Sequence, residues 1–396
     1  MNPDLNRLQP YPFEKLAALV ADIRPPEGLA PIALTIGEPK HPVPRIILES
    51  YQGALEEIGQ YPNTLGKPEL RHAIAGWLGR RFGIAEDEID PDRHILPVSG
   101  TREALFAFAQ TIVERRPNAK VLMPNPCYQI YEGAALLAGA SPHYLACTDD
   151  NGLLPDFDAV SDAVWNDCQL LYLCSPGNPT GAVMPVETLQ KLIGLAQQHD
   201  FIIASDECYS EIYLDEARPP PGLLQAASAM GLQGFDRCVV FHSLSKRSNV
   251  PGIRSGFVAG DAAALEAFRR YRTYHGCTMS PAVQTASIAA WNDELHVQEN
   301  RSLYRRKFEA FLEITGDMLD CQAPDGSFYL WPRLPMDDCE FTRRLLREQN
   351  VRVVPGSFLS REVGGHNPGQ NHVRMSLVAS VEECTEAARR IRALLA

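Results

Sequence analysis

The sequence predicts an α/β fold in which a large domain, built on a mainly parallel central sheet flanked by helices, is joined to a smaller α+β domain. Three observations predict this fold: the chain length, the alternation of two hydrophobic periodicities, and a change of pattern after about residue 282. A chain of 396 residues, 45% of them hydrophobic, is longer than one hydrophobic core usually serves. We therefore expect two domains.

Short apolar runs alternate with amphipathic segments through the middle of the chain. Helical periodicity is found at 70–82 and 103–115. The apolar runs, which we interpret as buried parallel strands, lie at 120–123, 170–174, 201–205 and 238–242. Strands separated by helices form a sheet that is covered on both faces, and binding sites in such sheets lie beyond the carboxyl ends of the strands.

Changes of pattern divide the chain into three parts. Residues 1–45 are rich in proline and weakly periodic, which predicts an extended arm that joins the small domain and lies on another surface, such as a partner subunit. Residues 46–281 form the expected large domain. The expected small domain, 282–396, contains a long charged helix at 294–319 and a strand at 326–331.

Charge and composition exclude several classes of function. The formal net charge is −12, and lysine and arginine are spread thinly, so we expect no nucleic-acid partner. No apolar run approaches the roughly 18 residues of a membrane span, and the N-terminus lacks a basic region followed by an apolar one. We expect a cytoplasmic protein without a membrane contact. The ten cysteines lack the spacing of a zinc site, so we expect no metal.

Lys246 differs from the other lysines in its neighbours. It follows the apolar run 238–241, with Ser243 and Ser245 before it and Arg254 after it. Hydroxyls and a guanidinium around an amine suit an anion such as a phosphate. A partly desolvated lysine near cations has a lowered pKa, so its free amine can attack a carbonyl. The alternative is a hydroxyl-rich turn with an exposed lysine, and Lys246 alone does not decide between them.

An acid and an amide follow two of the predicted strands. Asp206 comes directly after the run 201–205, where a carboxylate is costly unless it meets a cation or a donor. The alternative is an aspartate that caps a helix. Asn178 lies in the turn 175–181, which two prolines and two glycines make rigid, and its amide can hold a hydroxyl. The alternative there is an ordinary turn.

A predicted helix start offers a place for a phosphate. Gly100 precedes Thr101 and Arg102 at the beginning of this helix. A glycine there exposes backbone N–H groups, and the helix dipole adds positive potential. Many helices begin in this way, so the feature has weight only together with the others.

These motifs occur in the order found in fold-type I aminotransferases of the class I/II group, which the chain resembles over nearly its whole length. The matching series is Gly37-Glu38-Pro39, Tyr61-Pro62, Gly100, Tyr128, Asn178-Pro179-Thr180-Gly181, Asp206-Glu207-Cys208-Tyr209, Ser243-Leu244-Ser245-Lys246, Arg254 and Arg374. The resemblance implies pyridoxal 5′-phosphate as cofactor, small amino acids and 2-oxo acids as substrates, and a homodimer with shared active sites.

The resemblance also implies how the cofactor ring is held. Lys246 would carry the cofactor as a Schiff base and then move the proton of the substrate's α-carbon. Asp206 would pair with the pyridine nitrogen, which makes the ring a stronger electron sink. Asn178 and Tyr209 would hold the phenolic oxygen of the ring, and Tyr128 would stack on its face. Lys246, Asp206 and Tyr209 are the implied catalytic residues.

The phosphate and the substrate have implied partners as well. The phosphate would be bound by Ser243, Ser245, Arg254, the backbone of Gly100, Thr101 and Arg102, and Tyr61 reaching across from the second subunit. Arg374 would bind the substrate's α-carboxylate by a bidentate pair, assisted by Gly37 and Asn178.

Within this group, three stretches (36–41, 99–106 and 246–252) resemble the N-succinyl-L,L-diaminopimelate aminotransferases of lysine biosynthesis. This resemblance implies exchange of an amino group between glutamate/2-oxoglutarate and N-succinyl-2-amino-6-ketopimelate/N-succinyl-L,L-diaminopimelate. Such a long substrate needs a second cationic contact for its remote carboxylate. The candidates are Lys40, Arg102 and Arg272, with His41 and His275 as further residues of the pocket. A surface salt bridge is the alternative for each cation.

Three alternatives remain open at this point. One is another class I/II aminotransferase acting on N-acetylornithine, aspartate or an aromatic amino acid, and a second is a β-lyase on the same fold. The third belongs to a different class, a regulator that binds pyridoxal phosphate without catalysis. Such regulators normally carry a DNA-binding segment ahead of this domain, whereas this sequence starts with the arm, so we expect an enzyme.

Overall fold

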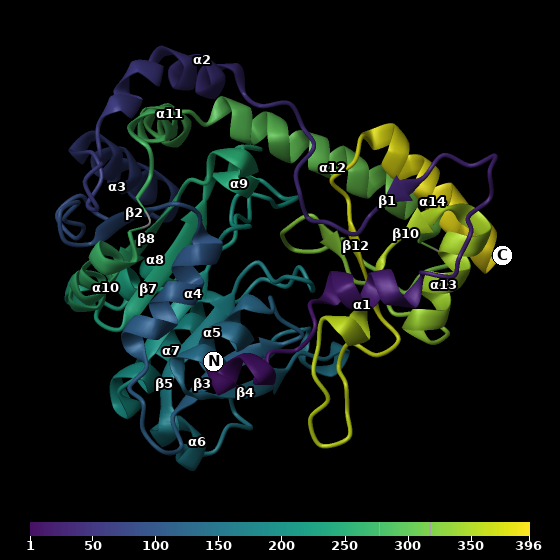
Figure 1. Cartoon of the computed structure of the whole chain (residues 1–396), viewed down its shortest axis with the longest axis horizontal. Helices are drawn as coiled ribbons and strands as arrows, with labels where there is room; N and C mark the ends of the chain where they lie inside the picture. Colours follow the sequence, from purple (N-terminus) through teal and green to yellow (C-terminus); the bar gives the residue numbers. More distant parts are fainter. Residues whose placement is uncertain (277, 317) are drawn as a thin grey trace.

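A seven-stranded sheet forms the centre of the larger part of the molecule (Figure 1). This computed structural model describes residues 1–276, 278–316 and 318–396. The strand order is β2-β8-β7-β6-β5-β3-β4; the pairs from β7 to β4 are parallel, and β8 is antiparallel to both of its neighbours. The strands are β2 (Ile95–Val98), β3 (Lys120–Asn125), β4 (Ser141–Ala146), β5 (Cys168–Cys174), β6 (Ile202–Asp206), β7 (Cys238–Ser243) and β8 (Gly256–Gly260). The expected mainly parallel sheet is confirmed.

The apolar runs that predicted strands lie in β3, β5, β6 and β7. Every residue of β5 and β7 is buried, because helices cover both faces of the sheet. Leu171 and Leu173 of β5 point into one hydrophobic core, while Leu170 and Tyr172 point into the core on the opposite face. Each strand therefore needs apolar residues at successive positions, which explains the unbroken apolar runs in the sequence.

Two sets of helices supply these cores. One core contains side chains of α3 (Pro68–Phe82), α7 (Val186–His199) and α8 (Leu223–Ala229), and the other contains side chains of α4 (Thr101–Ile112), α5 (Ile130–Ala138) and α10 (Ala262–His275). The helix expected at 70–82 is α3, which ends at Gly83 in the left-handed conformation with φ 69°. The helix expected at 103–115 is α4, which ends at Ile112. The helix ends there because Pro117 follows shortly after, and the residue before a proline disfavours the helical conformation.

The smaller body packs around a long helix, α12 (Leu295–Thr315), which runs beside α14 (Val381–Leu395). A three-stranded antiparallel sheet of β11 (Val354–Pro355), β12 (Val373–Ser376) and β9 (Tyr329–Leu330), together with α13 (Asp338–Gln349), completes it. The strand expected at 326–331 is shorter in the structure. Gly326 and Ser327 donate instead to the carbonyls of Gly181 and Ile212 in the larger body.

The N-terminal arm is partly helical rather than extended. It contains the short helix α1 (Pro12–Leu19), which lies against β11, and the strand β1 (Ile32–Ala33), which pairs in parallel with β10 (Val351–Arg352). The turn Pro3–Arg7 contacts α5 of the larger body. This strand pairing supports our proposal that the arm joins the small domain.

Helix α11 (Pro281–Asn292) lies at the boundary that we expected between the domains. It packs against α2 (Arg45–Gly53) and α3, and its side chains Val283, Ala286 and Trp291 belong to a core of the central sheet. Figure 1 shows α11 beside α2, with α12 leading away to the smaller body. We therefore propose that the large domain extends through α11 and that the small domain begins with α12.

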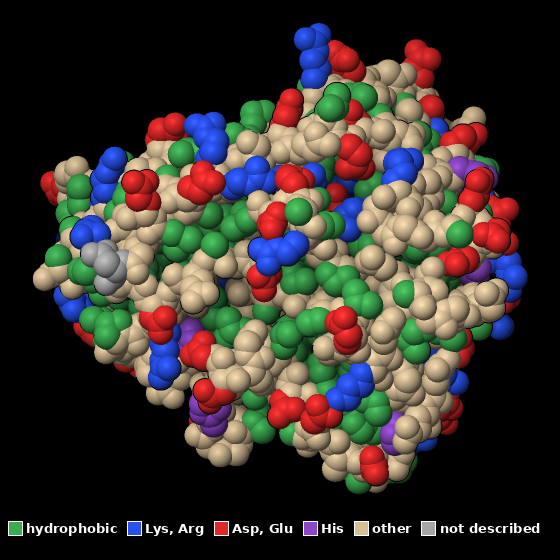
Figure 2. Space-filling view, turned by 180° about the vertical axis from the view of Figure 1, so that it is seen from behind, with side chains coloured by type: hydrophobic (Ala, Val, Ile, Leu, Met, Phe, Trp, Pro, Cys, Tyr) green, Lys and Arg blue, Asp and Glu red, His purple; other side chains and the backbone are tan. Residues whose placement is uncertain are grey.

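The surface carries charges of both signs. On the face that Figure 2 shows, lysine and arginine side chains are interspersed with aspartate and glutamate. A binding surface for nucleic acid is usually a basic stripe, and this face does not offer one. None of the helices in the described part of the chain combines the length and the hydropathy needed to cross a bilayer.

Candidate active site

The carboxyl ends of β5, β6 and β7 open into a cavity of about 560 Å³ that is also lined by residues of the arm and the small body. Most of the residues that the sequence singled out line it. They are Gly37, Thr101, Arg102, Tyr128, Asn178, Asp206, Tyr209, Ser243, Ser245, Lys246, Arg254 and Arg374. Because parallel strands end at one edge of a sheet, motifs far apart in the sequence meet here.

Lys246 lies on the single-turn helix α9 (Leu244–Arg247), directly after β7. The side chain of Ser243 caps this turn by accepting a hydrogen bond from the backbone N–H of Ser245 at 3.1 Å. The amine of Lys246 donates to the carbonyl of Gly37 in the arm. Burial, with a smaller contribution from the positive charge of Arg374, lowers the pKa of Lys246 to about 8. About a tenth of this amine is therefore uncharged at pH 7, far more than for an ordinary lysine, and can act as a nucleophile.

Asp206 ends β6, where its carboxylate is 4% exposed. It accepts hydrogen bonds from the hydroxyl of Tyr131 at 2.7 Å and from the backbone N–H of Cys208 at 3.2 Å. Both of these donors are neutral, and burial raises the pKa of the Asp206 carboxyl. A cationic N–H in the cavity would offset the cost of this buried acid, so the site suits a ligand with a protonated ring nitrogen.

Arg374 projects from β12 into the cavity. Its guanidinium donates to the Asn178 side-chain oxygen at 3.1 Å and to the carbonyl of Thr35 at 2.8 Å. It also lies over the ring of Tyr329, 4.6 Å from the ring centroid. These contacts fix the plane of the guanidinium, and a fixed plane is what bidentate recognition of a carboxylate requires.

Tyr209 and Tyr329 form a pair at the back of the cavity. Their hydroxyls are hydrogen-bonded at 3.1 Å, and both rings are buried. A β-carbon at Gly37 would overlap the hydroxyl of Tyr329, so the approach of the arm requires a glycine at this position. Tyr329, on the two-residue strand β9, was not among the residues that the sequence indicated for the site.

The start of α4 and Arg254 form a cradle for an anion. Gly100, with φ 94°, is the residue before α4, and a β-carbon there would overlap the guanidinium of Arg254. Arg254 donates to the carbonyl of Pro251 at 2.9 Å and forms an ion pair with Glu103 at 3.0 Å. Backbone N–H groups of a helix start and an adjacent guanidinium suit a phosphate.

Arg102 extends toward the arm side of the cavity. Its guanidinium donates to the hydroxyl of Tyr11 at 3.1 Å and lies 5.9 Å from the centroid of the Tyr128 ring. Tyr11 and its neighbour Phe13, both of the arm, also line the cavity. Neither residue could be singled out from the sequence, because the arm carries no periodic pattern that would indicate which side chains face inward.

Several candidates for the remote carboxylate do not reach this cavity. Lys40 and His275 are exposed and do not line it. Arg272 is buried and donates to the carbonyl of Pro97 at 2.6 Å. His41 is hydrogen-bonded to Asn300 on α12. Of the residues that we considered for the remote carboxylate, Arg102 alone is among those lining the cavity.

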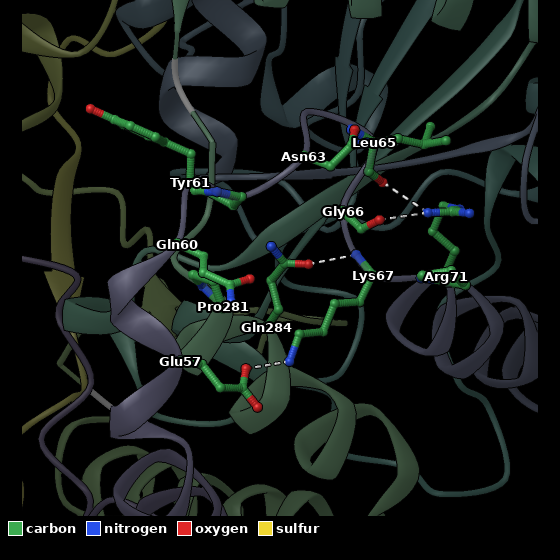
Figure 3. Close-up of a pocket in the computed structure, with 12 residues that line it drawn as sticks. Glu57, Gln60, Tyr61, Asn63, Leu65, Gly66, Lys67, Arg71, Pro281 and Gln284 are labelled. Atoms are coloured by element: carbon green, nitrogen blue, oxygen red, sulfur yellow. Dashed lines mark hydrogen bonds and ion pairs between the residues drawn. The ribbon is translucent and has the colours of Figure 1, made fainter.

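Tyr61 lies outside this cavity as well. It belongs to a second cavity, shown in Figure 3, which is lined by the loop before α3 and the start of α11. Its ring projects away from the neighbouring side chains and is fully exposed. Within one chain Tyr61 therefore cannot contact the residues around Lys246, and its implied role depends on a second subunit.

The fold and the cavity suit an enzyme that binds an anionic ligand beside an amine of lowered pKa. The family described as "Aminotransferase class I and II" matches residues 30–391, and the chain belongs to this family. A solved aminotransferase from Neisseria meningitidis is 47% identical, with a TM-score of 0.96 and all of both chains covered.

Two relatives have more specific descriptions. The LL-diaminopimelate aminotransferase of Aquifex aeolicus is 33% identical, and the match covers 98% of this chain and 98% of the relative. A solved protein from Thermus thermophilus, described as a probable N-succinyldiaminopimelate aminotransferase, is 29% identical with a TM-score of 0.85. That match covers 97% of this chain and 100% of the other.

The cofactor of this family is pyridoxal phosphate, and the substrates are amino acids and 2-oxo acids. The cavity fits this cofactor in three respects. Asp206 lacks a cationic donor among its described contacts, Gly100 and Arg254 leave a cradle for the phosphate, and the amine of Lys246 has a lowered pKa. Tyr128, Asn178 and Tyr209 surround the space between these groups.

Proposed function

We propose that this protein exchanges an amino group between glutamate/2-oxoglutarate and N-succinyl-2-amino-6-ketopimelate/N-succinyl-L,L-diaminopimelate, as a succinyldiaminopimelate transaminase of lysine biosynthesis. The observation that carries the proposal is the presence of two arginines, Arg374 on β12 and Arg102 on α4, in the cavity that holds Lys246. One guanidinium suits the α-carboxylate and the other the remote carboxylate of a long substrate.

In this proposal Lys246 and Asp206 carry the proton chemistry. When bound, the cofactor supplies an electron sink for the substrate's α-carbon. The Nζ atom of Lys246 accepts the proton that leaves the α-carbon and later returns it, which its lowered pKa favours. Asp206 keeps a proton on the ring nitrogen by charge pairing. Tyr209 and Asn178 would hold the phenolic oxygen, and Tyr128 would cover the face of the ring.

The remaining residues orient the two molecules. Arg374, fixed by Asn178 and the carbonyl of Thr35, binds the α-carboxylate beside Gly37. The phosphate would be held by Ser243, Ser245, Arg254 and the backbone from Gly100 through Thr101 to Arg102. Because the backbone of Arg102 serves the phosphate, its side chain is available for the remote end of the substrate.

A second candidate is amino transfer to and from L,L-diaminopimelate without the succinyl group. The description of the Aquifex aeolicus relative favours it, and Glu38, an exposed carboxylate that lines the cavity, could hold a distal ammonium. The two substrates differ at this end, since succinylation replaces the ammonium by an amide and adds a carboxylate. Glu38 opposes the added carboxylate, whereas Arg102 attracts it.

A half-reaction panel separates the two candidates. The cofactor-loaded protein is mixed with N-succinyl-L,L-diaminopimelate, L,L-diaminopimelate, N-acetylornithine, aspartate or glutamate, and conversion of the cofactor is followed by absorbance. We expect conversion with the succinylated substrate and with glutamate. Conversion with free diaminopimelate and none with its succinylated form would replace the first assignment by the second while leaving the aminotransferase class intact.

The protein acts as a homodimer in our proposal, with Tyr61 of each subunit completing the phosphate site of the other. The loop that carries Tyr61 is held in place by Arg71, which donates to the carbonyls of Leu65 and Gly66, and by Lys67, whose N–H donates to Gln284 (Figure 3). Exposed apolar side chains precede this loop in the sequence: Ile36, Val43, Ile46, Leu48, Leu55 and Ile58. A rigid loop with an exposed aromatic tip and apolar neighbours suits an interface between two copies.

A further inference from the structure

A chain of three polar side chains connects the arm to the backbone of Lys246. The amine of Lys307 lies 2.6 Å from the Nε2 atom of His41, and the Nδ1 atom of His41 lies 2.6 Å from the side-chain oxygen of Asn300. The amide nitrogen of Asn300 donates to the carbonyls of Lys246 at 3.3 Å and Arg247 at 3.4 Å. This series of hydrogen bonds therefore connects α12, the arm and the end of α9.

The direction of these hydrogen bonds is fixed by the lysine. Because an ammonium group only donates, Nε2 of His41 accepts from Lys307 and the ring proton lies on Nδ1. Nδ1 then donates to the Asn300 oxygen, which turns the amide nitrogen toward the carbonyls of α9. The neutral form of His41 that this requires is favoured, since burial and the charge of Lys307 lower its pKa to about 4.

Burial makes this arrangement costly to disturb. Lys307 is 1% exposed and Asn300 is 2% exposed. The Tyr304 ring covers the group, with its centroid 4.7 Å from the Lys307 amine and 4.6 Å from the centroid of the His41 ring. A purely structural network would satisfy these buried polar groups and do no more.

The groups at the two ends of this series of hydrogen bonds indicate a further role. The carbonyls of Lys246 and Arg247 lie at the end of α9, where a helix lacks partners of its own for its last carbonyls, and Asn300 supplies them. The arm residues 36–38, a few positions before His41, line the cavity, and the carbonyl of Gly37 accepts from the Lys246 amine. Lys246 is thus connected to the arm twice. Its amine donates to Gly37, and its backbone carbonyl accepts from Asn300, which in turn bonds to His41.

We infer that Asn300 is a positioning residue, which holds the backbone of Lys246 and, through His41, the arm wall of the cavity in one fixed relationship. This inference rests on the proposed role of Lys246 as the reactive amine. When that amine leaves Gly37 to react, the Asn300 connection remains and keeps the arm in place. Lys307 sets the orientation of the amide, because it determines which ring nitrogen of His41 carries the proton.

Two variants test this inference by different routes. Asn300→Asp keeps an acceptor for His41 and has nearly the same shape, but it faces the two carbonyls with an oxygen in place of a donor. Lys307→Met keeps most of the length of the side chain and removes the donor to His41, and Lys307→Arg should restore this donor. Gln298→Ala, at an exposed position on the same helix, is the matched control.

The measurements separate positioning from folding. We expect both variants to recombine with pyridoxal phosphate about tenfold more slowly than the control when the cofactor is added back to the stripped full-length protein, since a displaced amine attacks the carbonyl from a poorer geometry. We also expect the limiting rate constant of the glutamate half-reaction to fall about tenfold per cofactor-loaded site, with a smaller change in the apparent Kd for glutamate. In the wild type, nitrogen NMR should find the His41 proton on Nδ1, and Lys307→Met should mix the two tautomers.

Each outcome has a defined meaning. If Asn300→Asp and Lys307→Met lower only the melting temperature, and each loaded site recombines and turns over at the rate of the control, Asn300 is structural and the inference is wrong. If Lys307→Arg fails to restore what Lys307→Met loses, the proposed role of Lys307 in orienting the amide is wrong. The proposed function fails separately, if borohydride reduction attaches the cofactor to a lysine other than Lys246.

Discussion

Arg374 of the small body and Asn178 of the large body are hydrogen-bonded at 3.1 Å, so the group that we propose for the substrate's α-carboxylate is fixed by the loop beside the cofactor site. The second contact of Arg374, to the carbonyl of Thr35, comes from the arm. Three separate segments of the chain therefore determine the position of one guanidinium.

Replacing Arg374 should weaken the reaction with every amino substrate. We expect Arg374→Ala to lower kcat/KM for glutamate and for the second substrate by about a hundredfold or more, because a buried charge-assisted pair typically contributes about 2–5 kcal/mol. Arg374→Lys keeps the charge without the planar fork, so its defect should be intermediate. Steady-state kinetics measures both, and cofactor content serves as the control. Unchanged glutamate kinetics in Arg374→Ala would remove this residue from the proposed carboxylate site.

Lys246 should control the stability of the cofactor-free protein at alkaline pH. Its pKa is lowered from 10.5 to about 8, chiefly by burial. Between these two pH values the unfolded chain binds more protons at this residue than the folded chain does, so folding becomes more favourable as the pH rises from about 8 to about 10.5. Denaturant unfolding of the stripped wild type and of Lys246→Met across this range measures the difference. Equal pH dependence in both proteins would contradict the lowered pKa.

The lowered pKa of Lys246 also predicts how the rate of cofactor attachment depends on pH. The rate at which the stripped protein captures pyridoxal phosphate should rise with pH up to about 8 and then level off, since only the uncharged amine attacks the carbonyl. Lys246→Ala should capture no cofactor covalently.

Asp206→Asn tests the charge that we propose opposite the ring nitrogen. The variant keeps the size of the side chain and an acceptor for the Tyr131 hydroxyl, but it removes the negative charge. We expect kcat to fall by at least about a hundredfold, since an electrostatic contact that strengthens as charge develops on the ring contributes about 3 kcal/mol or more. Tyr131→Phe, which removes only the neutral donor, is the matched control and should lose much less. Similar kcat values for the two variants would show that the charge of Asp206 is not required.

The part of the site that could be predicted lies at the ends of buried strands. Asp206 and Lys246 follow apolar runs directly, so the sequence alone indicated both the strand and the edge at which its last polar residue would lie. The strand around Tyr329 was expected, but Tyr329 reaches the cavity through antiparallel pairing of β9 with β12, and the sequence does not indicate which strand is the partner. The residues Tyr11 and Phe13 were missed for a related reason, since α1 packs on distant elements of the fold.

The candidates for the remote carboxylate illustrate the limit of reading charge from a sequence. Arg272 and Lys40 carry the same charge as Arg102. The structure places Arg272 in the interior against a backbone carbonyl and Lys40 at the exposed surface, so only the tertiary fold separates the three.

Arg102→Gln should change selectivity more than overall activity. We expect kcat/KM for N-succinyl-L,L-diaminopimelate to fall about 10- to 50-fold, because a charge-assisted hydrogen bond to the remote carboxylate is lost. Any residual reaction with N-acetylornithine, which lacks that carboxylate, should be nearly unchanged. Tyr11→Phe is the control, because it removes the hydroxyl that accepts from Arg102 and leaves the cation in place. Equal losses for both substrates in Arg102→Gln would assign this side chain to the cofactor phosphate instead.

Subunit mixing provides the sharpest test of the role proposed for Tyr61. The ring of Tyr61 is fully exposed in the single chain and lies in a cavity separate from that of Lys246. If each site takes Lys246 from one subunit and Tyr61 from the other, a dimer formed from one Tyr61→Ala chain and one Lys246→Ala chain contains one intact site and one doubly defective site. Because random pairing gives such hybrids in about half of the dimers, co-refolded mixtures should regain about a quarter of the wild-type activity, although the Lys246→Ala parent is inactive and the Tyr61→Ala parent is impaired. If Tyr61 serves its own subunit or no site at all, mixing yields no more than the average of the two parents.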